Sequence, residues 1–289
     1  EGPAPPFELV THVPTSELPE DSVVGPADRA DIDLVIVAQL GDDQTADRLA
    51  ALNFGGTTVV DSAGAYAALT GRIPVRQVTS RWFIATGDFS SLATSGFHHV
   101  QRFLDVVTAL AMLILASPLL LLASVGIVFT DGRPVLYKQT RLGKFRRPFT
   151  LYKLRTMRRS AETKGPQFSS EDDDRVFAVG RFLRRWRIDE LPQLINVLRG
   201  EMSLVGPRPE RPELAAKLER EIPFYAFRYS VRPGLTGWAQ VQFPYCAEPE
   251  EHLVKLEFDL YAVRHHGPAL YVVVLLRTLG ALIFPPKNT

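Results

Sequence analysis

The sequence predicts a small α/β domain followed by an α+β domain that sits at a membrane through a proline-broken helix. Three observations support this fold class. Short β-prone runs alternate with helical spacing at about 31–95, an uncharged run of membrane-spanning length follows at 106–129, and charged strand and helix patterns fill the remainder. The chain has 289 residues, 46% of them hydrophobic, which is enough for about two domains with separate cores.

The first part of the chain is predicted to be a linker and a small accessory domain. Residues 1–30 are rich in proline and acids, so they are interpreted as a linker or a truncated lead. In 31–95, β-prone runs at 34–38 and 57–60 alternate with helical patterns, which predicts a partial Rossmann-like α/β unit with parallel strands. No Gly-x-Gly-x-x-Gly motif follows either strand, so an accessory or regulatory role is preferred over dinucleotide binding.

A long apolar helix is predicted at 98–130. Its uncharged stretch, 106–129, is long enough at about 1.5 Å per residue to cross a ~30 Å hydrocarbon core. Pro118 removes a backbone hydrogen bond near the middle, and the Ser117 hydroxyl can partly satisfy the freed carbonyl. A bent span or a re-entrant helix would result. Basic residues on both flanks favour the re-entrant form, which keeps both soluble parts in the cytosol.

The remainder of the chain, 131–289, is predicted to form a mixed α+β domain. Short strands at 135–138 and 149–153 flank a turn, and a basic amphipathic helix then runs to about Arg187. The apolar run 269–284 is shorter than a membrane span and contains an arginine. It is therefore interpreted as a packed or interfacial helix.

The charge distribution narrows the class of partner. The net charge is only +1, but Lys138 to Arg159 contains nine basic residues and no acid. A basic strip directly after an apolar run indicates anionic lipid headgroups or phosphorylated substrates, and it argues against nucleic acid. The single cysteine, Cys246, excludes an internal disulfide and a cysteine-rich metal site, and it fits a reducing, cytosol-facing location.

The densest block of motif-like sequence runs from Ile188 to Glu210 and contains adjacent carboxylates at Asp189 and Glu190. Pro192 fits the first turn of a new helix, which would place Asp189 near an N-cap where the helix dipole favours its ionised form. An ionised carboxylate among arginines can attack phosphorus. The same pair can also be an ordinary helix cap and a solvated acid, so by itself it leaves both interpretations open.

The surrounding motifs resemble one protein family. The runs 151–157 (LYKLRTM), 188–210 and 231–240 (VRPGLTGWAQ) follow the proline-broken segment in that order. Together they resemble the bacterial sugar transferase family, the monotopic polyprenyl-phosphate glycosyl-1-phosphate transferases, over about 98–289. The α/β part that precedes them resembles the accessory domain of the family's larger members.

The resemblance implies a reaction and its residues. A sugar 1-phosphate would pass from a UDP-sugar to undecaprenyl (polyprenyl) phosphate, giving UMP and starting exopolysaccharide, capsule or O-antigen synthesis. Asp189 would be the nucleophile of a covalent phosphosugar intermediate, and Glu190 would hold Mg²⁺, which prefers one or two carboxylates plus phosphate oxygens. The cations that match the family's phosphate or nucleotide contacts are Lys153, Arg184 and Arg208. Further substrate contacts implied by the matching motifs are Arg155, Glu210, Arg232 and Gln240.

The chain departs from the family pattern at Trp186 and Arg187, where Thr or Ser often stands, and at Phe177, which replaces a common Thr. These differences bear on the donor sugar and on depth in the membrane, and the sugar stays open. The resemblance implies the bacterial inner membrane, an active site facing the cytosol, membrane lipid as a partner and a possible homo-oligomer.

Three other functions stay open beside the transferase. They are a catalytically silent membrane-anchored scaffold, a lipid or nucleotide binding module, and an ordinary glycosyltransferase that would release UDP. The last would need a metal motif such as the acidic run 172–174, which is more simply a solvated turn or a helix cap.

Overall fold

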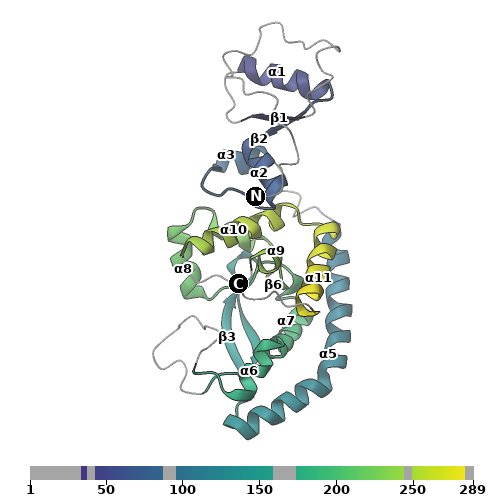
Figure 1. The fold of residues 1–289 in the computed structure, drawn as a ribbon, viewed down its shortest axis with the longest axis vertical. Helices are drawn as coiled ribbons and strands as arrows, with labels where there is room; N and C mark the ends of the chain where they lie inside the picture. The colour runs from purple at the N-terminus through teal and green to yellow at the C-terminus, as the bar shows by residue number, and fades with distance from the viewer. Residues whose placement is uncertain (1–33, 38–42, 87–95, 159–173, 244–248, 284–289) are drawn as a thin grey trace, which may run out of the picture. The chain divides into compact units, whose positions relative to one another are not determined.

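The computed structural model of the protein describes residues 34–37, 43–86, 96–158, 174–243 and 249–283 (Figure 1). The chain divides into two compact units, Glu1–Pro74 and Val75–Thr289. The predicted lead at 1–30, the acids at 172–173 and Cys246 lie outside the described residues. The domain boundaries drawn from the sequence stay predictions.

The first unit contains two parallel strands joined by a helix. In chain order its elements are β1 (Leu34–Val37), α1 (Asp43–Phe54), β2 (Thr58–Asp61) and α2 (Ser62–Thr70), and β1 pairs with β2 in parallel. Parallel neighbours need a crossover connection, and α1 lies within it. The predicted alternation with parallel pairing is confirmed, whereas a larger Rossmann-like sheet is not.

The second unit contains two further strand pairs. β3 (Leu136–Leu142) and β4 (Pro148–Leu154) form an antiparallel hairpin, and η2 (Lys144–Arg146) lies in its turn. Phe149 and Leu151, two residues apart on β4, are both buried, as the period of a strand requires. β5 (Ser203–Val205) pairs in parallel with β6 (Gly234–Thr236). The hairpin predicted from 135–153 is thus confirmed, with longer strands than expected.

Helices and 3-10 turns make up most of the second unit (Figure 1). They are α3 (Ser80–Ala85), α5 (Phe97–Asp131), α6 (Ala178–Arg185), η3 (Ile188–Gln193), α7 (Leu194–Arg199), α8 (Pro212–Glu221), η4 (Tyr225–Ser230), α9 (Trp238–Gln242), α10 (Pro249–Arg264) and α11 (Pro268–Ile283). One hydrophobic cluster joins Ala109 of α5 and Leu151 of β4 to Leu194 of α7. In α11, Val274 is fully buried while Leu276 is exposed, so this helix is packed, as predicted.

The apolar helix α5 is one continuous element that changes direction along its length (Figure 1). The predicted break at Ser117 and Pro118 is not confirmed, because the helix continues through both residues. Pro118 leaves the carbonyl of Ile114 without its helical donor, and the Ser117 hydroxyl donates to that carbonyl at 2.8 Å, as expected. The re-entrant geometry stays a prediction.

Most of the apolar part of α5 is exposed. In its most apolar 18-residue window only 11% of the residues are buried, and Leu115 is 80% and Phe129 87% exposed. Among the described residues, α5 is the one helix with the length and composition to cross a membrane. A soluble core helix of the same composition would be mostly buried, so the exposure favours contact with lipid.

The first turns of α5 are attached to the rest of the unit by polar side chains. Gln101 donates to the Ser203 hydroxyl at 2.9 Å, and the Arg102 guanidinium donates to the carbonyls of Val197 and Leu198 at the end of α7. The buried Asp105 carboxylate accepts from the Leu204 amide at 3.0 Å and from the Tyr271 hydroxyl at 2.9 Å. These contacts fix the position of β5 and α11 relative to the apolar helix.

Candidate active site

The adjacent carboxylates lie in η3, which follows α6 after a sharp turn of the backbone. Arg187 makes this turn with a positive φ of 56°, and the 3-10 helix then runs from Ile188 to Gln193 before α7 begins. A new helix starting at Pro192 was expected, but Pro192 lies inside η3 and the carboxylates occupy its first turn. Asp189 is only 5% exposed, so it is not a solvated surface acid.

Burial dominates the electrostatics of Asp189. It raises the pKa of this carboxyl to about 6 from an ordinary 3.8, the charge of Glu190 adds to the effect, and Lys153, Arg184 and Arg187 oppose it. The expectation that a helix N-terminus would favour the ionised form is not met, because burial raises the pKa of Asp189. A carboxyl group with this pKa is still mostly ionised at neutral pH and is more basic than an ordinary aspartate.

Glu190 behaves in the opposite way from its neighbour. Burial alone would raise its pKa, but the guanidinium of Arg208 at 2.8 Å and that of Arg187 at 3.7 Å reverse the effect and hold the pKa at about 2. Glu190 therefore stays ionised across the physiological range. Neighbouring carboxylates with separated pKa values are a common feature of sites that divide two chemical roles.

Several cations from different elements converge on this pair. Lys153 comes from β4, Arg184 from α6 and Arg208 from the segment after β5. Burial lowers the pKa of Lys153, and the charges of Asp189 and Glu190 counteract that effect. Arg184 donates to the Thr156 hydroxyl at 3.0 Å. The structure thus brings together the carboxylates and the three cations predicted first, in a cluster suited to a diphosphate.

Two further arginines near the site were not among the predicted contacts. Arg187 lies three residues before Glu190 and pairs with it. The spacing is visible in the sequence, but the contact could not be predicted without the left-handed turn at Arg187. Arg141 on β3 lies close enough to Arg208 for the two charges to interact, and burial lowers its pKa to about 10. In the sequence, Arg141 was visible as one of the nine basic residues between Lys138 and Arg159.

Four predicted contacts are engaged elsewhere. Arg155 donates to the Asp131 carboxylate and to the carbonyls of Gly132 and Pro134, so it holds the end of α5. The remaining three are also held by protein groups: Glu210 by Lys255 at 2.7 Å, Arg232 by the Gly200 carbonyl at 3.0 Å, and Gln240 by the Leu235 carbonyl at 3.3 Å. Their roles as substrate contacts stay predictions without support from these contacts.

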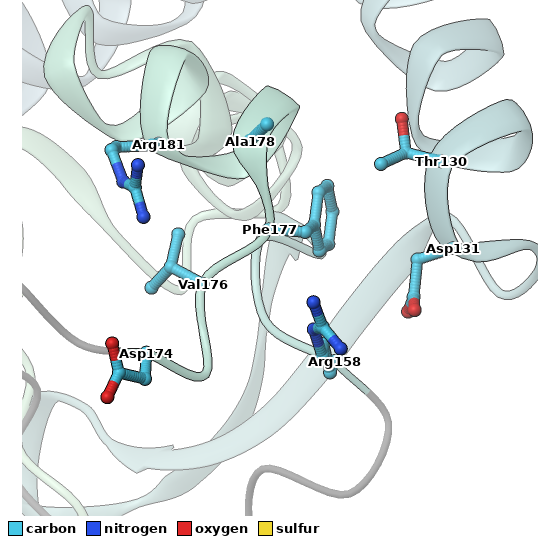
Figure 2. Close-up of a pocket in the computed structure, with 8 residues that line it drawn as sticks. All are labelled: Thr130, Asp131, Arg158, Asp174, Val176, Phe177, Ala178 and Arg181. Atoms are coloured by element: carbon cyan, nitrogen blue, oxygen red, sulfur yellow. The ribbon is translucent and has the colours of Figure 1, made fainter.

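A separate cavity of about 440 Å³ lies between the end of α5 and the start of α6 (Figure 2). Figure 2 shows Arg158 and Arg181 on its wall with Phe177. None of the residues that line it is a predicted nucleophile. Of its two acids, Asp131 is paired with Arg155, and Asp174 is the last residue of the acidic run 172–174. We therefore assign the candidate active site to the carboxylate pair.

The carboxylate pair fits part of a magnesium site. Mg²⁺ typically takes one or two carboxylates and completes its coordination with substrate phosphates and water. Asp189 and Glu190 offer such donors, and Glu190 is ionised, as a ligand must be. In the part of the chain that the structure describes, no group of three His, Cys, Asp or Glu side chains is gathered for a metal, so an all-protein site has no support there.

Comparison with known proteins places this geometry in a family. The model of the bacterial sugar transferase family matches residues 97–285, well over half of the chain, and the match contains α5 and the whole carboxylate site. The chain belongs to this family. The resemblance inferred from the motifs around Asp189 is thereby confirmed.

Relatives of the chain carry related names. A UDP-N-acetylgalactosamine-undecaprenyl-phosphate N-acetylgalactosaminephosphotransferase from Aeromonas hydrophila is 38% identical over 74% of this chain and 50% of its own length. A UDP-glucose:undecaprenyl-phosphate glucose-1-phosphate transferase from Caulobacter vibrioides is 50% identical over 49% of this chain and 53% of its own length. An exopolysaccharide production protein from Rhizobium leguminosarum is 39% identical over 62% of this chain and 93% of its own length. The chain thus spans about half the length of the first two.

Proposed function

We propose that the protein transfers a sugar 1-phosphate from a UDP-sugar to undecaprenyl phosphate, giving a polyprenyl diphosphate-sugar and UMP. The observation that carries the proposal is Asp189, a buried carboxylate with a pKa raised to about 6, beside an ionised Glu190 and among convergent cations. The names of the relatives support the acceptor and the reaction class. They differ in the sugar, so the donor sugar of this chain is left to experiment.

In the first step, a carboxylate oxygen of Asp189 attacks the phosphorus that carries the sugar. A bond forms between that oxygen and phosphorus, and the bond to the bridging diphosphate oxygen breaks, so UMP leaves with the electron pair. The raised pKa of Asp189 supports this role, because a more basic oxygen is a better nucleophile while still ionised at neutral pH. The product is an acyl phosphate that links Asp189 to the sugar phosphate.

The cations act on charge that builds up on the diphosphate. The charges of Lys153 and Arg184 partly counteract the rise that burial causes in the pKa of Asp189, so both cations act on negative charge at this place. The same cations would stabilise phosphate oxygens bound there. Arg208, paired to Glu190 at 2.8 Å, has a planar fork that can serve a carboxylate and a phosphate together. Mg²⁺ held by Glu190 would neutralise part of the diphosphate charge and favour departure of UMP.

In the second step, an oxygen of undecaprenyl phosphate attacks the same phosphorus. The phosphorus–oxygen bond to Asp189 breaks, the carboxylate is regenerated, and the polyprenyl diphosphate-sugar leaves. This step needs a lipid phosphate at the carboxylate. The exposed apolar length of α5, together with Phe182 of α6 and Trp186 directly after that helix, each 56% exposed, supports a position at the headgroup level of the membrane.

We further propose that the protein acts at the cytosolic face of the bacterial inner membrane, with α5 as a re-entrant helix, and starts a polysaccharide. The basic residues on both sides of α5 support the orientation. The relative named as an exopolysaccharide production protein supports the pathway class.

The test uses the full chain purified in lipid nanodiscs with Mg²⁺, undecaprenyl phosphate and a panel of UDP-sugars. We expect UMP from one donor, its loss in Asp189→Asn, and its retention in Arg199→Gln, which changes an exposed arginine of α7 outside the site. Release of UDP would point to an ordinary glycosyltransferase. Equal UMP release by wild type and Asp189→Asn would remove Asp189 from the chemistry, and no nucleotide from any donor would favour a silent scaffold.

A further inference from the structure

We propose that Arg228, which lies in η4 and reaches none of the carboxylates of η3, is a positioning residue for Arg208. The inference rests on the proposed function, in which Arg208 serves the carboxylate site. Arg228 is 1% exposed at its side chain, which makes it one of the most deeply buried charges among the described residues. A fully buried guanidinium destabilises the fold unless its N–H groups are hydrogen-bonded. The groups that Arg228 contacts therefore indicate what it does in the structure.

The Arg228 guanidinium connects three separate elements. Its Nε and Nη2 donate to the Asp259 carboxylate of α10 at 3.0 and 2.6 Å. Its Nη1 donates to the Tyr225 hydroxyl of η4 at 3.1 Å. Its Nη2 also donates to the main-chain carbonyl of Arg208 at 3.0 Å. Arg228 therefore ties the backbone that carries Arg208 to α10, while the Arg208 side chain extends to Glu190.

The segment 207–210, which contains Arg208, depends on hydrogen-bond donors from other parts of the chain. Pro207 and Pro209 have no amide hydrogen, so the segment cannot form a regular ladder of its own. Its four consecutive carbonyls each accept a hydrogen bond from another part of the chain: Pro207 from the Gly234 amide, Arg208 from Arg228, Pro209 from Arg141 and Glu210 from the Leu142 amide, at 2.9, 3.0, 2.9 and 2.9 Å. Two of the four donors are arginine side chains, and Arg228 is the buried one.

Glu210 belongs to the same network. Its carboxylate accepts from Lys255 at 2.7 Å and lies 3.6 Å from Nη1 of Arg228. Asp259 and Glu210 thus provide two negative charges for the buried Arg228 and the half-buried Lys255. This arrangement gives Glu210 a role in holding the segment.

The start of the segment is fixed by contact between two backbones. A Cβ atom placed on Gly234 would lie 2.1 Å from the Gly206 amide nitrogen, and one on Gly206 would lie 2.3 Å from the Arg232 carbonyl. No side chain fits in this space, so the chain enters the segment from β5 at one position. Arg228 then holds the backbone at Arg208 itself. The two constraints together fix the position from which the Arg208 side chain extends.

The need to position Arg208, more than a need for stability, explains why residue 228 is an arginine. A buried ion network can often be replaced by apolar side chains without loss of stability. The acceptors around Arg228 are reached from three different nitrogens, Nε, Nη1 and Nη2, whereas the three donors of a lysine ammonium all leave one nitrogen and cannot span the same acceptors. Arg228→Lys keeps the charge next to Asp259 and removes the simultaneous contact with the Arg208 carbonyl.

The first measurement is hydrogen exchange of the full chain in nanodiscs. The amides of Gly234 and Leu142, which donate to the Pro207 and Glu210 carbonyls, report on opening of the segment. We expect Arg228→Lys to speed their exchange about tenfold while the other amides of the β3–β4 hairpin keep their rates. Arg102→Lys, which weakens a different arginine-to-carbonyl contact at the end of α7, is the matched control and should leave the segment unchanged. Wild-type exchange in Arg228→Lys would overturn the proposal.

The second measurement is a double-mutant cycle on the turnover number for UMP release. If Arg228 acts through Arg208, Arg228→Lys lowers kcat about tenfold or more in the wild-type background and has little further effect once Arg208→Lys is present. The effects of Arg102→Lys and Arg208→Lys should multiply. Multiplying effects of Arg228→Lys and Arg208→Lys would overturn the proposal.

The two measurements also separate this inference from the proposed function. A wild-type chain that releases no UMP would refute the proposed function, and the exchange rates would still decide whether Arg228 holds the segment. If Arg228→Lys does not fold, the same exchange test uses Asp259→Asn, which keeps the shape of the partner and removes its charge. Unchanged exchange in that variant would count against the proposal equally.

Discussion

Replacing the proposed nucleophile should make the folded chain more stable, although it should destroy activity. The pKa of Asp189 is about 6 in the folded chain against an ordinary value of 3.8, so the folded state binds this proton more tightly than the unfolded state does. A group of this kind favours folding below pH 3.8 and loses that contribution as the pH rises to about 6. Above that pH, ionised Asp189 disfavours the folded state.

The size of the effect follows from the two pKa values. A difference of about two pH units means that ionised Asp189 destabilises the folded chain by about 3 kcal/mol. Asp189→Asn should remove this destabilisation at pH 7.5, because asparagine has a similar shape and no charge. For a unit of this size the gain corresponds to a rise of roughly 5–10 °C in the unfolding temperature. At pH 4, where wild-type Asp189 is protonated, the gain should fall below about 1 kcal/mol.

The assay is thermal unfolding of both chains in detergent with EDTA at pH 7.5 and pH 4, because bound metal would stabilise the ionised form. Glu190→Gln is the matched control with the opposite sign. Its pKa of about 2 lies below the ordinary 4.5, so ionised Glu190 stabilises the fold above pH 4.5 and that contribution is lost as the pH falls toward 2. Loss of stability in Asp189→Asn at pH 7.5 would refute the assignment of a desolvated carboxylate with a raised pKa.

Three further predictions concern the scaffold. Gly180→Ala should destabilise the second unit by about 3 kcal/mol, since its Cβ would lie 2.2 Å from the Thr156 carbonyl oxygen. Unfolding midpoints would show this, with Gly267→Ala, where the nearest atom is 3.9 Å away, as the unaffected control. Asp105→Leu should cost about 2 kcal/mol, because it leaves the Leu204 amide and the Tyr271 hydroxyl without their acceptor; an unchanged midpoint would contradict this. Leu115→Lys should reduce the share of the chain in salt-washed membranes, as a lysine in the hydrocarbon costs about 3 kcal/mol, whereas Leu69→Lys in α2 should not.

Local features of the structure were predictable from the sequence. The β3–β4 hairpin and the helix α11 follow from side-chain periodicity over short stretches, which depends little on the rest of the fold. Ser117 was correctly expected to satisfy the carbonyl freed by Pro118. The break of the helix at Pro118 was not confirmed, because the helix continues through that residue.

Features that depend on burial were not predictable in this way. The motifs indicated Asp189, but its raised pKa comes from desolvation by residues distant in sequence, and this reversed the expected effect of the helix terminus. Arg155 stands inside a family motif and yet holds the end of α5, 24 residues away. Arg228 has no local signal at all, because its importance lies in contacts with α10 and with the Arg208 carbonyl.

The most direct test of the central claim is to look for the sugar phosphate on Asp189 itself. Purified chain would be incubated with Mg²⁺ and a UDP-sugar labelled at the sugar phosphate, in the absence of undecaprenyl phosphate. The account predicts up to one equivalent of UMP released per chain and the label on the peptide that contains Asp189, removed on addition of the lipid phosphate and absent in Asp189→Asn. UMP release that begins only when the acceptor is added, with no label on the chain, would contradict the covalent mechanism.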